Sequence, residues 1–122
     1  MDNHKKTLVI GASENPERYS YLAINRLVKY GHEVVAIGQK KGEVSGIKFD
    51  TEKQPYTGID TVTLYINPAI QQTYYDYILS LHPKRIIFNP GTENDELEEL
   101  AKANGIKPQE ACTLVLLGTG QY

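Results

Sequence analysis

The sequence predicts a single doubly wound α/β domain, with a mainly parallel sheet of five or six strands and helices on both faces. Three observations support this fold class. Short apolar, β-branched runs alternate with amphipathic helical segments along the whole chain. Glycine, asparagine or proline follows most of these runs and marks turns. The 122 residues, 40% hydrophobic and 23% charged, suffice for one hydrophobic core, so one domain over residues 1–122 is expected.

The beginning of the chain reads as strand, helix and strand. Thr7–Ile10 is an apolar run typical of a strand that is buried on both faces. A helix is expected from about residue 20 to residue 30, where apolar residues recur at helical spacing and Gly31 follows as a stop. Val34–Ile37 is the next buried strand. This order implies a right-handed crossover and parallel pairing.

The middle of the chain is less regular. Residues 38–46 form a polar, glycine-bearing loop, and Ile47–Phe49 is expected as a short edge strand. Residues 51–58 read as irregular. Thr61–Ile66 is a further strand, and the dipeptide after it is expected to begin a helix, with asparagine as the cap and proline in the first turn.

The last part repeats the alternation. Pro83 is expected to end the second helix, and Arg85–Phe88 is the next strand. Thr92 is expected to cap a third helix that runs through Ala103, with acidic residues in its first turn. A last strand is expected within 106–112. The apolar segment that follows it, 114–117, is expected to dock on the body of the domain.

Composition excludes several classes of protein. The formal net charge of −2 argues against non-specific binding to nucleic acid. No apolar run approaches the roughly 20 residues that a membrane span needs. The start of the chain lacks the apolar region of a secretory signal, so the cytoplasm is the expected compartment. The single cysteine, Cys112, excludes an intramolecular disulfide.

In doubly wound sheets, ligands bind beyond the carboxyl ends of the strands. The first such loop carries Gly11, Ala12 and Ser13, small residues that let a ligand approach the main chain before a helix begins. A helix start favours phosphate, and Arg18 lies just downstream. The alternative is that Gly11 only makes a turn and Arg18 is a solvated surface residue.

The same loop argues against a dinucleotide site. The G-x-G-x-x-G positions hold Gly11, Ser13 and Pro16, so two of the three glycines are missing. A nicotinamide site also wants an acidic residue after the second strand, where this chain has Gly38-Gln39-Lys40-Lys41. Lysines there suit an additional phosphate group, although they also suit a solvated turn.

The loops after the next two strands end with a small polar residue and a proline. Asn67 can contact a ligand or cap its own helix, and capping is favoured. Asn89, followed by Pro90 and Gly91, has no obvious helix to cap, so a role at the ligand edge is as well supported as a structural one.

Catalytic and metal-ligating groups are scarce. The three histidines, His4, His32 and His82, are scattered and have no metal-ligand spacing. Cys112 has no neighbouring histidine in sequence and reads as a small buried residue rather than a nucleophile. The acidic residues of 93–99 read as a helix start and a solvated face. No catalytic residue and no metal site are therefore assigned.

The loops resemble those of the CoA-binding domain family, small Rossmann-like proteins related to the N-terminal domain of the succinyl-CoA synthetase α subunit. The resemblance covers nearly the whole chain and rests on VIGASENPERYSY at residues 9–21, GHEVVAIG at 31–38, IDTVTLYINP at 59–68 and IIFNPGTENDELEELAKANGI at 86–106. It implies that CoA, or an acyl-CoA, is bound by three loops. By position, those loops contain Gly11, Ala12, Ser13, Arg18, Tyr19 and Ser20, then Gly38, Gln39 and Lys40, then Ile66, Asn67 and Pro68. Many relatives have N-P-K where this chain has Gly38-Gln39-Lys40, which bears on the ligand more than on the fold.

The leading hypothesis is a non-catalytic CoA-binding module whose partner is a small nucleotide ligand. The alternatives are a small nucleotide-dependent enzyme, either an NAD(P)-type oxidoreductase or an acyl-CoA-handling protein that uses Cys112, and an interaction module whose pocket is vestigial. Tyr74, Tyr75 and Tyr77 cannot all face the sheet, so a homodimer through some of them is a further expectation.

Overall fold

The computed structural model describes residues 4–122 and shows a five-stranded parallel sheet in the order β2-β1-β5-β6-β7. This order is a common doubly wound arrangement, and it confirms the predicted fold class. The strands are β1 (Thr7–Ala12), β2 (Val34–Gly38), β5 (Thr61–Leu64), β6 (Arg85–Phe88) and β7 (Lys107–Glu110). The helices are α1 (Tyr19–Lys29), α2 (Pro68–Gln71), α3 (Tyr75–Leu81), α4 (Asp95–Ala103) and α5 (Thr113–Gly118), with the 3-10 turn η1 (Gln72–Tyr74) between α2 and α3.

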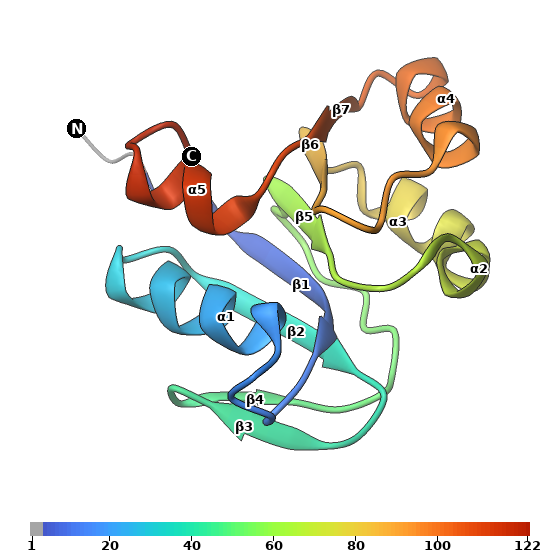
Figure 1. Ribbon diagram of the computed structural model, residues 1–122. Coiled ribbons are helices and arrows are strands. Elements are labelled where there is room, and N and C mark those ends of the chain that lie inside the picture. The colour runs from blue at the N-terminus through green and yellow to red at the C-terminus, as the bar shows by residue number, and fades with distance from the viewer. Residues whose placement is uncertain (1–3) are drawn as a thin grey trace.

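The helices form a layer on each face of the sheet (Figure 1). On one face, Ile24 and Leu27 of α1 and Leu117 of α5 pack with Val9 of β1. On the other face, side chains of α3 and α4 pack on the opposite side of the same strands, where Leu8 is fully buried. Alternate residues of β1 thus enter two separate cores, which is why the strand is apolar throughout.

Residues between β2 and β5 depart from the predicted edge strand. Residues 47–49 do form a strand, β4 (Ile47–Phe49), but it pairs antiparallel with β3 (Gly42–Val44) in a separate hairpin. Ser45 and Gly46 both have positive φ at the turn of this hairpin. The hairpin is tied to the main sheet by a bridge from Ile37 to Asp50, and β4 lies beside β2 (Figure 1).

Several element ends differ from the prediction. The strand expected to reach Ile66 ends at Leu64, and the helix after it is divided by η1. The prediction that Thr92 caps the third helix is wrong, because Asn94 accepts the hydrogen bond from Leu97 N. Thr92 instead donates its hydroxyl to Asn89 O. The apolar tail forms α5, whose buried leucines dock on the domain as expected.

None of the helices in residues 4–122 has the length and apolar character needed to cross a membrane. The three tyrosines considered for a homodimer are each half-buried against the core. Tyr77 donates its hydroxyl to Gln54 O, Tyr75 bonds Asn94, and Lys53 lies over the ring of Tyr74. All three therefore have contacts within the chain, and the homodimer stays a prediction.

Candidate functional site

A cleft of about 770 Å³ opens at the carboxyl edge of the sheet. It lies over the ends of β1 and β5, where the chain order reverses from one side of β1 to the other. Such switch points leave a crevice between loops that run to opposite faces. Its size is within the usual range for small-molecule sites.

The floor of the cleft depends on Gly11. Its φ is +100°, and a Cβ built there would lie 2.8 Å from the carbonyl oxygen of Tyr65. Tyr65 N in turn donates to Ile10 O at 2.8 Å. The first and third loops therefore touch through their backbones, and only glycine permits this contact.

The first loop leaves several donors directed at the cleft. Ser13 Oγ accepts a hydrogen bond from Asn15 N at 3.0 Å, so its own hydroxyl hydrogen remains available. No side chain caps α1, and its first turn contains no acidic residue. No side chain within residues 4–122 therefore caps the N–H groups at the start of this 11-residue helix.

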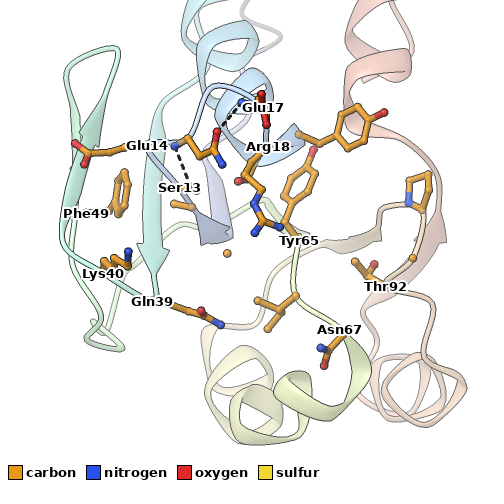
Figure 2. A pocket seen from close by; sticks show the side chains of 18 of the residues that line it. Ser13, Glu14, Glu17, Arg18, Gln39, Lys40, Phe49, Tyr65, Asn67 and Thr92 are labelled. Carbon is orange, nitrogen blue, oxygen red and sulfur yellow. Dashed lines mark hydrogen bonds between the residues drawn. The ribbon is translucent and has the colours of Figure 1, made fainter.

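Three cations line the cleft. Arg18 extends its guanidinium toward the centre, between Ser13 and Tyr65, and Lys40 lies beside β2, below Phe49 in the view of Figure 2. Lys41 follows it on the same corner. Within residues 4–122, none of the three forms an ion pair. Two carboxylates, Glu14 and Glu17, also line the cleft, so its net charge is positive by one.

A buried glutamine, which was not predicted from the sequence, connects the two loops on the opposite wall of the cleft. Gln71 is fully buried and donates to Ile66 O at 2.8 Å and to Thr92 O at 2.7 Å. Its carbonyl accepts from Asn94 at 2.9 Å. The loops after β5 and β6 are therefore held at a fixed separation.

Tyr65 was not predicted as a site residue, yet it forms part of the cleft wall. Its hydroxyl is buried and makes no hydrogen bond of normal geometry within residues 4–122, although the hydroxyls of Thr63 and Thr113 lie nearby. Burial raises the pKa of Tyr65 well above its ordinary value. The side chain therefore stays a neutral phenol and contributes mainly an aromatic surface.

Most of the residues singled out from sequence come together here. The cleft is lined by Gly11, Ala12, Ser13, Arg18, Tyr19, Ser20, Gln39, Lys40, Ile66, Asn67, Pro90 and Gly91. Asn67 also accepts from Ile70 N, which confirms that it caps α2. Lys41, which the sequence analysis considered with Lys40 for an additional phosphate, also lines the cleft. Residues that were not singled out as site residues are Glu14, Asn15, Glu17, Phe49, Tyr65 and Thr92.

Three predicted residues lie outside the lining. Gly38 is buried in β2, where a Cβ would lie 2.7 Å from Ala12 O. Pro68 is the exposed first residue of α2. Asn89 is buried and points inward, donating to Thr63 Oγ1 and Leu64 O and accepting from Thr113 N. Its amide therefore joins β5, β6 and α5, and it is not directed at the cleft.

Cys112 and an acidic cluster are not part of the cleft lining. Cys112 is half-buried at the start of α5. Asp95, Glu98 and Glu110 gather between α4 and β7, with oxygens within 4.8 Å of one another. Burial, with repulsion from Glu110 and Asp95, raises the pKa of Glu98 to about 7. This cluster is separate from the cleft residues and supplies no group to them.

Comparison with known proteins gives a family and a fold. Residues 5–118 match the model of a protein family described as "CoA binding domain". A solved structure described only as an uncharacterized protein is 55% identical, has a TM-score of 0.96, and is matched over 99% of this chain and 100% of that chain.

Two more distant structures share the fold. A hypothetical protein from Pyrococcus horikoshii OT3 is 26% identical, with a TM-score of 0.83 over 93% of this chain and 81% of that chain. A protein from Thermus thermophilus is 21% identical, with a TM-score of 0.82 over 98% and 91%. A search of curated proteins found no match.

Proposed function

The chain belongs to the CoA-binding domain family, and from that premise we propose that it binds CoA or an acyl-CoA in the cleft at the carboxyl edge of the sheet. The observation that carries the proposal is the convergence on one cleft of three cations without an ion pair to residues 4–122 and of the start of α1, which no side chain in that range caps. A ligand with several phosphate groups satisfies all of them at once.

The arrangement suggests which part of the ligand each loop binds. The diphosphate takes the position in front of Ser13, Arg18 and the first turn of α1, where N–H and hydroxyl donors meet a cation. The additional ribose phosphate of CoA takes the corner formed by Lys40 and Lys41. An acidic residue at this corner, as a bare ribose diol requires, is absent from the sequence 38–41.

The rest of the ligand follows the cleft across β5 toward β6. Tyr65, Ile66 and Pro90 offer apolar surface there, which suits the uncharged arm of CoA. The lining contains no cysteine or histidine, and Cys112 lies outside it. These features favour binding without a covalent intermediate on the protein.

The melting temperature of the protein with different nucleotides tests this proposal. A ligand at about one hundred times its Kd stabilises by about 2.7 kcal/mol, which corresponds to about 10 °C in a domain of this size. We expect CoA to raise Tm by about that amount, dephospho-CoA to raise it less, and NADH least. Stabilisation by NADH without any by CoA would contradict the proposal and favour an oxidoreductase.

A further inference from the structure

A glycine with close neighbours lies on each side of the corner that carries the two lysines. Gly38 precedes it, and a Cβ there would lie 2.7 Å from Ala12 O. Gly42 follows it, and a Cβ there would lie 2.8 Å from both Glu14 Cγ and Phe49 Cζ. A Cβ at either position would be closer than the 3.4 Å of ordinary contacts, so the chain on each side of Gln39–Lys41 approaches its neighbours more closely than a larger residue would allow.

One side chain of the first loop joins this corner to the hairpin. Glu14 is exposed, yet its carboxylate turns away from Arg18 and toward the hairpin beside Phe49 (Figure 2). Its Oε2 accepts a hydrogen bond from Glu43 N at 2.9 Å. A charged acceptor makes a stronger bond than a neutral one. Glu14 therefore connects the first loop with the middle residue of β3.

This contact has a consequence for the lysines. Lys40 and Lys41 lie between Gly38 and Gly42, and Gly42 is the first residue of the hairpin. The position of their backbone therefore depends on the position of the hairpin. Flexible lysine side chains lose conformational entropy when they bind a ligand, and a fixed backbone lowers that cost in free energy. A carboxylate beside an anion site ordinarily weakens anion binding by repulsion. The hydrogen bond from Glu43 N holds the Glu14 carboxylate toward the hairpin.

We propose that Glu14 is a positioning residue that makes the cleft selective for nucleotides with a phosphomonoester on the ribose, by holding the hairpin so that Lys40 and Lys41 meet that phosphate. This inference rests on the proposed function. It assigns Glu14 no contact with the ligand, and it separates recognition of the additional phosphate from recognition of the diphosphate.

The test is the ratio of the affinities for CoA and dephospho-CoA, measured by titration calorimetry at constant ionic strength. The Glu14→Ala variant is expected to bind CoA about tenfold more weakly, the effect of losing one charge-assisted hydrogen bond. Any change in its affinity for dephospho-CoA is expected to be smaller, since that ligand lacks the phosphate concerned. The ratio therefore falls toward one.

Two further variants act as controls. Glu14→Gln retains an oxygen acceptor for Glu43 N and is expected to restore most of the selectivity. Glu43→Ala removes one negative charge from the same hairpin but leaves its backbone N–H, and it is expected to leave the ratio unchanged. Circular dichroism and the melting temperature confirm that each variant is folded.

The outcomes separate the inference from the proposed function. If the wild type binds neither nucleotide, the proposed function fails and the inference with it. If the wild type binds both equally, or Glu14→Ala weakens both to the same extent, CoA binding stands and the role of Glu14 is refuted. If Glu14→Gln loses as much selectivity as Glu14→Ala, the carboxylate acts by its charge and the hairpin contact is not the cause.

Discussion

Replacing Gly11 with alanine is expected to lower the free energy of unfolding by about 3 kcal/mol, from a strained positive φ combined with overpacking. The added methyl group would lie 2.8 Å from Tyr65 O and 2.9 Å from Tyr65 C, both backbone atoms that cannot turn aside. β1 and β5 must then separate where their loops form the cleft floor. Loss of CoA binding is expected in the fraction that still folds, and urea denaturation measures the stability change.

Gly91→Ala is a matched control for this substitution. Gly91 has a φ of +92°, close to that of Gly11, but a Cβ there meets nothing within 4 Å. Its replacement carries backbone strain without the collision and is expected to cost about 1 kcal/mol. Equal stability of the two variants would show that the contact between Gly11 and Tyr65 is unimportant.

Replacing Asn89 with alanine is expected to destabilise the protein by about 4 kcal/mol, because three hydrogen bonds are lost and buried partners are left unsatisfied. Asn89 is 2% exposed and bonds Thr63 Oγ1 at 2.7 Å, Leu64 O at 2.9 Å and Thr113 N at 2.9 Å. Chemical denaturation, followed by CoA titration of the folded variant, checks both stability and binding.

The control is Asn104→Ala, which removes a single exposed hydrogen bond to Leu100 O and is expected to cost less than about 1 kcal/mol. The pair also tests the role at the ligand edge that the sequence suggested for Asn89. A stable Asn89→Ala variant that has lost CoA binding would restore that role and contradict the structural one.

The sequence was sufficient for the parallel sheet because its buried strands are continuous apolar runs such as Thr7–Ile10. It was insufficient where two local signals compete. Thr92 and Asn94 are both good helix caps by residue type. Asn94 is the cap in the structure, and it also donates hydrogen bonds to Gln71 and Tyr75, which are far away in the sequence. The tail 114–117 has no periodicity, so α5 could not be distinguished from a docked strand.

The residues of the candidate site could also be predicted from the sequence only in part. Glycine, serine and lysine in the loops after β1 and β2 could be singled out, because their chemistry is local and the topology fixes the edge they occupy. Gln71 and Glu14 could not, since a glutamine in a short helix and a glutamate in a polar loop both read as solvated. Their importance lies in partners 29 residues away for Glu14 and 21 residues away for Gln71.

The central claim is that CoA occupies the cleft over β1, β2 and β5, and a titration of ¹⁵N-labelled protein with CoA, followed by amide chemical shifts, tests ligand and location together. We expect the largest shifts on the amides of 11–20 and 39–41 and smaller ones at Ile66 and Asn67, and we expect dephospho-CoA to leave 39–41 nearly unshifted. An absence of shifts at millimolar CoA, or shifts centred on His82 and Lys84 in a separate hollow at the amino end of the strands, would contradict that claim.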